Sequence, residues 1–303
     1  DNVLLTSWNW VYLSDYASFK PTHLPADNPA AFSYFFDISG RRTCGIAPER
    51  FYEVDPTASA ESQSCRFDGT VTPAMDIFSL GCVIYEMMTD GKHLFDLSML
   101  LDFREGKLDQ TVLLEALPDA EIRKLVAHMT NLDPTKRLSA QQYLSQLKGK
   151  VFPKSFSEIL HGYMRGYVSG EALTPDQKVM RLLRDFDTLS SGIEASKDDS
   201  ALDESASCYV IIGQLVTACW RSLASTSAKV AALDLLQLIS LSVDDEYKLD
   251  RYVPFLIASL TDSVALVRAT ALRTLTKIVE PVKIVRANDL NLFPSYIFPQ
   301  VAA

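Results

Sequence analysis

The second half of the chain repeats itself at a constant offset of 39 residues, from position 229 to position 268. The matching positions are Lys229–Leu233 with Arg268–Leu272, Leu236 with Leu275, and Ile239 with Ile278. Each copy places apolar residues at helical spacing, and a period of about 40 residues built from two helices is typical of an α-solenoid. We therefore predict stacked two-helix repeats in this part of the chain. An ordinary helical bundle is the alternative.

The patterns after residue 150 predict three further segments. Four apolar helices are expected over residues 208–223, 227–242, 248–260 and 264–281, so that 208–303 forms the repeats. Residues 190–207 hold five acidic side chains and one lysine among serines and alanines, which predicts a flexible acidic linker. Residues 151–189 are expected to be a helical connector, whose main helix begins at Thr174-Pro175.

Composition limits the possible partners and the compartment. There are 29 Lys and Arg against 38 Asp and Glu, and a formal charge of −9 argues against an overall electrostatic attraction to nucleic acid, although it leaves a local basic patch open. Five cysteines without a C-x-x-C pair argue against a disulfide scaffold or a zinc module, and favour a reducing compartment. No apolar run approaches the ~20 residues of a membrane-spanning helix. Because the chain opens on a strand-like segment without an initiator Met, we expect a piece of a longer protein.

The first half combines a short hairpin, long loops and one apolar helix. Val3–Leu5 and Val11–Leu13 predict the two strands of the hairpin. Thr72-Pro73 begins a helix that Gly91 ends. Because Ile77–Met88 is apolar on nearly all sides, we expect this helix to lie buried at the centre of its domain.

Two polar residues flank the predicted hairpin. Asn2 precedes its first strand and Asp15 follows its second, so an out-and-back path returns both to one edge. One amide oxygen and one carboxylate there can share a divalent cation, and Mg²⁺ prefers such oxygen ligands. The sequence therefore predicts Asn2 and Asp15 as metal ligands, although such residues also commonly form turns.

Several motifs within residues 1–150 resemble, in order, the C-terminal lobe of a eukaryotic protein kinase. They are Asn2 before a hydrophobic strand, Asp15-Tyr16-Ala17 in the place of D-F-G, Ala47-Pro48-Glu49 as A-P-E, Asp76–Gly81 as the start of the buried helix, and Arg137 in the segment Leu132–Arg137. The expected fold class is accordingly mainly α: a kinase C-terminal lobe truncated at the catalytic loop, a helical connector and a helical-repeat solenoid.

The resemblance also implies a role for each matched residue. Glu49 and Arg137 are expected to form a structural ion pair, since a buried carboxylate needs a partner and Arg offers a bidentate fork. Asp76 is expected to accept hydrogen bonds from loop backbone. The catalytic Asp, the phosphate-binding Lys and the Gly-rich loop all precede the position of Asn2 in that family. The resemblance thus implies that the catalytic Asp lies upstream, so no catalytic residue is expected within this chain, and ATP with Mg²⁺ is expected only in the full-length protein.

Two departures from the kinase pattern weaken the case for efficient catalysis. Ala17 stands where the family has glycine and restricts the backbone at the turn into the activation segment. Gly45 occupies a position that is often bulky, which puts the peptide-substrate platform in doubt. Thr43, beside Arg41 and Arg42, is a candidate regulatory phosphorylation site, with a plain exposed arginine pair as the safer interpretation.

The segment Val253–Leu275 closely resembles a HEAT repeat. Pro254 bends its first helix, Asp262 lies in the turn, and Val267-Arg268 opens its second helix. Asp262 and Arg268 are expected to form a hydrogen-bonded ladder with neighbouring repeats, which is a structural role.

The whole chain resembles the regulatory protein-kinase subunit of the class III phosphatidylinositol 3-kinase complex, in the vacuolar protein sorting 15 family. The segments that carry this resemblance are Ser7–Trp10, Phe19–Pro21, Tyr34–Asp37, Ile46–Phe51, Leu182–Asp187 and Ala271–Leu275. It implies a scaffold that binds nucleotide and holds the lipid kinase subunit and Beclin-type coiled-coil subunits on endosomal, vacuolar, Golgi and autophagosomal membranes. Membrane attachment would come from a lipid anchor outside this chain, and no nucleic-acid partner is implied. The alternative is an active serine/threonine kinase whose HEAT repeats bind partners.

Overall fold

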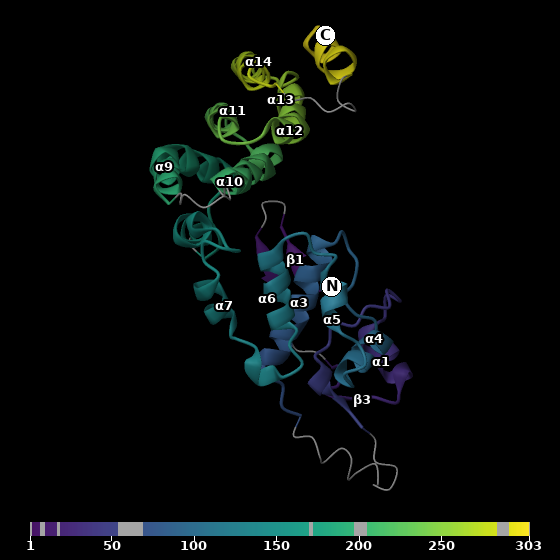
Figure 1. Cartoon of the computed structure of the whole chain (residues 1–303). Coiled ribbons are helices and arrows are strands. Elements are labelled where there is room, and N and C mark those ends of the chain that lie inside the picture. The colour runs from purple at the N-terminus through teal and green to yellow at the C-terminus, as the bar shows by residue number, and fades with distance from the viewer. Residues whose placement is uncertain are drawn as a thin grey trace. The chain divides into compact units, whose positions relative to one another are not determined.

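The computed structural model describes residues 2–6, 10–16, 19–53, 69–169, 172–196, 205–283 and 291–302 of the 303-residue chain. These residues are mainly α-helical (Figure 1). They divide into two compact units, Ala17–Val151 and a second one that combines Asp1–Tyr16 with Phe152–Ala303. The main part of the second unit begins at Phe152, one residue later than the expected start of the connector at 151. This unit also contains the N-terminal hairpin, which was expected to belong to the first 150 residues.

The unit formed by Ala17–Val151 has a short parallel strand pair and a group of helices. Its elements are β3 (Leu24–Pro25) paired with β4 (Phe51–Tyr52), α1 (Pro29–Phe36), the 3₁₀ turns η1 (Pro48–Arg50) and η2 (Pro134–Lys136), α3 (Pro73–Met88), α4 (Leu97–Arg104), α5 (Gln110–Leu114), α6 (Ala120–Met129) and α7 (Ala140–Gln146). Phe78, Phe95 and Leu100 are fully or almost fully buried at the centre of its core. Asn28, Asp96 and Asp119 cap α1, α4 and α6 with their side chains, which satisfies backbone N–H groups at those helix starts.

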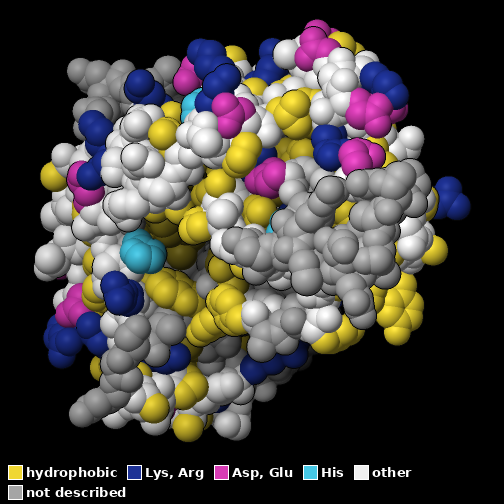
Figure 2. Space-filling view, turned by 90° about the horizontal axis from the view of Figure 1, so that it is seen from below, with side chains coloured by type: hydrophobic (Ala, Val, Ile, Leu, Met, Phe, Trp, Pro, Cys, Tyr) yellow, Lys and Arg dark blue, Asp and Glu magenta, His cyan; other side chains and the backbone are white. Residues whose placement is uncertain are grey.

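Helix α3 lies in the core of its unit, as expected, but one strip of it is exposed. Its buried residues are Met75, Ile77, Phe78, Gly81, Cys82 and Tyr85. It begins at Pro73 as predicted, and its Gly81 lies so close to α6 that an added Cβ would stand 2.9 Å from Cγ2 of Thr130. The opposite side chains of Leu80 and Met87 are 41% and 69% exposed. The described neighbours of α3 are chiefly α6 and η2, with Phe95 stacked on Phe78. An apolar sequence pattern cannot show how many sides of a helix are covered. Figure 2 shows hydrophobic side chains at the surface between charged ones on the face that it presents.

The second unit is built from paired helices. Its elements are the hairpin strands β1 (Val3–Leu5) and β2 (Val11–Leu13), the π-helical turns η3 (Phe156–Leu160), η5 (Lys248–Tyr252) and η7 (Phe293–Ile297), the 3₁₀ turn η4 (Trp220–Ser222), and the helices α8 (His161–Ser169), α9 (Pro175–Ala195), α10 (Ser205–Cys219), α11 (Thr226–Ser240), α12 (Asp245–Tyr247), α13 (Val253–Ser259), α14 (Ala265–Val279) and α15 (Phe298–Ala302). The four helices predicted after residue 207 correspond to α10, α11, η5 with α13, and α14.

Helix α11 lies between α9 and α14, and α10 and α13 pack against α11 and α14 respectively (Figure 1). Leu236 and Ile239 of α11 are fully buried, and so is Ile278 at the repeat-related position of α14. The repeat pattern read from the sequence thus marks the packed faces of two neighbouring helices. No described helix is long and apolar enough to cross a membrane.

The predicted acidic linker, 190–207, is helical at both of its ends. Helix α9 continues to Ala195 and α10 begins at Ser205, while residues 197–204 lie outside the described residues. The extension of α9 is stabilised by Ile193, which is fully buried, and by a 2.7 Å hydrogen bond between the hydroxyls of Ser190 and Tyr209. One buried residue in an otherwise polar stretch was too weak a signal to predict this.

The hairpin is antiparallel, with Val3 opposite Leu13 and Leu5 opposite Val11. Trp10, at its turn, stacks on the imidazole of His161 in α8, with 5.6 Å between ring centroids and 7° between planes. This contact attaches the hairpin to the helical unit. Ser7–Asn9 and Ala17, which contributed to the sequence prediction, lie outside the described residues.

Candidate functional site

Asn2 and Asp15 lie at the same open end of the hairpin. The backbone N–H of Ser14 donates to the carbonyl of Asn2 at 2.9 Å, and Asp15 follows directly. Asp15 has a φ of 62°, a left-handed conformation that Asp tolerates better than most residues. Both residues are exposed, and one carboxylate with one amide oxygen is a donor set that suits Mg²⁺ when water and phosphate complete the shell. In the described part of the chain, no group of three or more His, Cys, Asp or Glu side chains could hold a metal.

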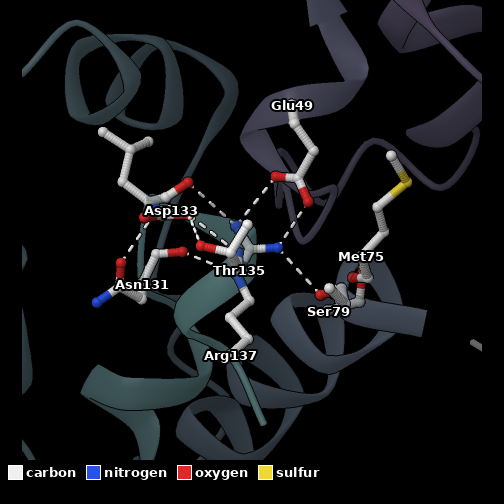
Figure 3. A network of polar contacts seen from close by, with 9 residues as sticks. Glu49, Met75, Ser79, Asn131, Asp133, Thr135 and Arg137 are labelled. Atoms are coloured by element: carbon white, nitrogen blue, oxygen red, sulfur yellow. Dashed lines mark hydrogen bonds and ion pairs between the residues drawn. The ribbon is translucent and has the colours of Figure 1, made fainter. Parts of the chain in front are cut away.

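Glu49 and Arg137 form a bidentate ion pair inside the first unit (Figure 3). Nη1 of Arg137 donates to one carboxylate oxygen at 2.7 Å and Nη2 to the other at 3.0 Å. The side chain of Arg137 is fully buried, whereas that of Glu49 is 21% exposed. The two residues are 88 positions apart, so the pair fastens the Ala47-Pro48-Glu49 segment to the turn after α6.

The remaining donors of Arg137 are also used. Nε donates to the carbonyl of Asn131 at 2.7 Å, and the two Nη atoms reach the carbonyls of Ala74 and Leu132. Its guanidinium lies 5.0 Å from the centroid of the Phe78 ring. All N–H groups of the buried cation thus have acceptors, which is the condition under which a buried charge is tolerated.

Asp76 lies on α3 and is exposed, and it accepts no hydrogen bond from the loop backbone described here. Its carboxylate interacts electrostatically with Arg50, a residue to which the sequence analysis gave no role. Arg50 donates to the carbonyls of Thr22 at 2.7 Å and Pro21 at 2.9 Å, and so holds the proline-rich loop. Burial lowers the pKa of Arg50, and the nearby carboxylate of Asp76 partly offsets this. The only sequence signal was that Arg50 directly follows Ala47-Pro48-Glu49.

Thr43 is half-buried in the segment that follows α1. Arg41 forms an ion pair with Glu86, and the backbone N–H of Arg42 donates to both carboxylate oxygens of Asp37 at 3.1–3.2 Å. The side chain of Arg41 therefore has a partner at this surface, whereas Arg42 is held through its backbone.

Asp262 and Arg268 both belong to a polar network at the starts of α11 and α14. The carboxylate of Asp262 accepts from Nζ of Lys229 at 2.6 Å and from the N–H of Val264 at 2.9 Å. Arg268 donates to the carbonyls of residues 262 and 263 rather than to a carboxylate. Lys229, which the sequence prediction did not include, is therefore the residue that links the two repeats. It occupies the position equivalent to Arg268, so the 39-residue offset could have pointed to it.

One repeat earlier, Asp176 at the start of α9 accepts from the N–H groups of Ala224 and Ser225, both at 2.9 Å. These hydrogen bonds hold the pKa of Asp176 below its usual range. The hydrogen bond from Lys229, helped by the N–H of Val264, likewise lowers the pKa of Asp262. Two carboxylates thus tie successive helix starts together.

These carboxylates predict a loss of stability in acid. A lowered pKa in the folded state means that the unfolded chain binds more protons than the folded one. The contribution of these carboxylates to the free energy of unfolding is therefore present above their ordinary pKa of 3.8 and is lost as the pH falls below it. We expect the thermal midpoint of the helical unit to drop below about pH 4. Asp176→Asn, which retains one acceptor oxygen, should flatten this dependence. An identical pH profile for the variant and the wild type would contradict the assignment to Asp176.

The chain is similar to proteins described as serine/threonine-protein kinase VPS15 from three organisms. It is 33% identical to the Arabidopsis thaliana protein over the whole chain, and 30% identical to the Schizosaccharomyces pombe and Saccharomyces cerevisiae proteins over 99% of the chain. The chain covers 26%, 22% and 25% of these relatives, so it spans about a quarter of their length. Residues 212–303 match the middle domain of the PIK3R4-like family.

The relatives, which are described as serine/threonine-protein kinases, match both units of the chain. The middle-domain model matches helical repeats in the second unit. The chain belongs to the VPS15 family.

Proposed function

We propose that the chain is part of a regulatory and scaffolding subunit of a class III phosphatidylinositol 3-kinase complex. In this proposal the unit Ala17–Val151, together with the hairpin, forms the C-terminal lobe of a kinase-like domain, and residues 208–303 form HEAT repeats. The observation that carries the proposal is the buried Glu49–Arg137 pair, which joins two kinase-like motifs in a chain that matches VPS15 relatives over its whole length. Such a pair stiffens a platform and performs no chemistry.

The partners proposed are the lipid kinase catalytic subunit, held by the kinase-like lobe, and Beclin-type coiled-coil subunits, reached by the repeats. The site of action is the cytoplasmic face of endosomal, vacuolar, Golgi and autophagosomal membranes, with attachment through a lipid anchor outside this chain. Thr43 is proposed as a regulatory position. Ladders such as Lys229–Asp262 support a rigid repeat array that could present a long surface to partners.

Nucleotide binding is proposed for the full-length protein, with Asn2 and Asp15 as the ligands of Mg²⁺. The bound cation would neutralise phosphate charge. The place of both oxygen donors at one end of the hairpin also favours the second candidate, an active serine/threonine kinase. The two candidates share these ligands and differ in whether phosphate is transferred.

The test compares Asp15→Asn and Glu49→Ala in the full-length protein. We expect Asp15→Asn to weaken ATP·Mg²⁺ binding in calorimetry and to abolish any autophosphorylation, while the lipid kinase subunit still co-purifies. Glu49→Ala should reduce co-purification because it loosens the lobe. Autophosphorylation that persists unchanged in Asp15→Asn would reject the metal-ligand role. If the Glu49→Ala protein is shown to have a misfolded lobe and still co-purifies normally with the lipid kinase subunit, the scaffolding role is rejected.

The isolated 303-residue chain provides an independent measurement. We expect it to bind ATP·Mg²⁺ weakly or not at all, because two oxygen ligands without phosphate-binding groups hold a nucleotide poorly. Micromolar binding by calorimetry would refute this.

A further inference from the structure

A cavity of about 460 Å³ opens between successive helix pairs in the second unit. Its apolar wall includes the rings of Trp220 and Phe255 together with Leu223. The polar groups that line it are Arg221, Lys229 and Asp262. Trp220 and Phe255 are half-buried, so both rings keep part of their surface accessible.

The charges in the cavity are not equally engaged. Lys229 and Asp262 are bound to each other at 2.6 Å, and Asp262 accepts a second hydrogen bond from the N–H of Val264. Arg221 is exposed and has no ion pair or hydrogen bond with any residue that the structure describes. The cavity is therefore lined by one guanidinium without a described partner, that of Arg221, close to the aromatic residues Trp220 and Phe255. Its other two charged residues, Lys229 and Asp262, are already paired with each other.

We propose that this cavity binds an acidic segment of a partner protein. A carboxylate of that segment pairs with Arg221, and a neighbouring apolar side chain lies against Trp220 and Phe255. The combination satisfies both parts of the cavity, since Arg forms strong bidentate hydrogen bonds with carboxylates and aromatic rings contribute most when they cover apolar surface. This binding site is independent of the nucleotide and of the kinase-like lobe.

A membrane surface fits less well. Recognition of anionic lipid typically uses clusters of about four to eight Lys or Arg. The lining has two cations, and Asp262 already neutralises one of them. A free inorganic anion would use Arg221 alone and leave the aromatic wall uncovered.

Calorimetry on the 303-residue chain can test this with two peptide probes. One is the acidic peptide acetyl-Glu-Glu-Leu-Phe-Glu-amide, and the other is its uncharged counterpart with Gln in place of each Glu. We expect the acidic probe to bind about tenfold more tightly, which corresponds to one charge-assisted pair. Arg221→Gln should remove this difference, and Phe255→Ala should weaken both probes. Arg251→Gln is the matched control, because Arg251 is exposed on η5 and does not line the cavity.

Hydrogen exchange in the presence of the acidic probe should show protection in η4 and α13, and circular dichroism of each variant should match the wild type. Failure of the acidic probe to bind, equal affinity for both probes, or unchanged binding by Arg221→Gln would overturn the proposal. Stronger binding of inorganic phosphate than of the peptide would also overturn it. So would Arg221-dependent binding of phosphatidylserine vesicles, because it would assign the site to a membrane.

Discussion

Replacing Glu49 by alanine is expected to destabilise the unit Ala17–Val151 by about 3–5 kcal/mol. The change leaves the guanidinium of Arg137, whose side chain is fully buried, without the two acceptors that lie 2.7 and 3.0 Å away. Three backbone carbonyls remain as partners but cannot neutralise the charge. Hydrogen exchange at increasing urea, followed on peptides from α3 and α6, measures the loss of unfolding free energy in this unit separately from that of the helical unit.

Glu121→Ala is the matched control, because Glu121 pairs with Lys124 at the surface of α6. An exposed pair of this kind contributes at most about 1 kcal/mol. Arg137→Lys should resemble Glu49→Ala, since an ammonium group cannot form the bidentate contact. Similar losses for Glu49→Ala and Glu121→Ala would show that the buried pair has no special role.

Replacing Gly213 by alanine is expected to destabilise the helical unit by about 1–3 kcal/mol, the usual cost of overpacking a core. An added Cβ at this position in α10 would lie 2.2 Å from the hydroxyl oxygen of Tyr252 and 3.0 Å from its Cζ. Tyr252 is fully buried, so its ring has little room to move aside. Thermal unfolding and hydrogen exchange of α10 and α13 measure the effect.

Tyr252→Phe provides the rescue, because it removes the atom nearest to the new methyl group. The Tyr252 hydroxyl has no hydrogen-bond partner within the described residues, so Tyr252→Phe alone should be neutral or slightly stabilising. The double variant should recover part of the loss caused by Gly213→Ala. Gly162→Ala is the control in α8, where nothing lies within 4 Å of an added Cβ, and it should be neutral or stabilising by up to about 1 kcal/mol. Equal effects of the two glycine substitutions would mean that the close approach does not limit packing.

Sequence motifs identified some of the contacts in the candidate site and missed others. The partner of Glu49 could be named from the kinase-like pattern, and the structure places Arg137 on it. The predicted ladder of Asp262 and Arg268 was less accurate, because the residue that reaches Asp262 from the neighbouring repeat is Lys229. Arg221 and Trp220 had no sequence signal at all, because an exposed arginine beside an aromatic residue becomes notable only when another helix forms a cavity next to it.

The sequence by itself determined the local features of this protein. The hairpin strands, the helix start at Thr174-Pro175 with its capping box, and the 39-residue repeat depend on residues that are close along the chain or on a periodic pattern. Only the tertiary structure decided that α3 exposes Leu80 and Met87, that α9 continues to Ala195, and that the hairpin packs on α8 through Trp10. These outcomes depend on which surfaces of distant segments meet, and a hydrophobic pattern records that a surface is apolar without recording what covers it.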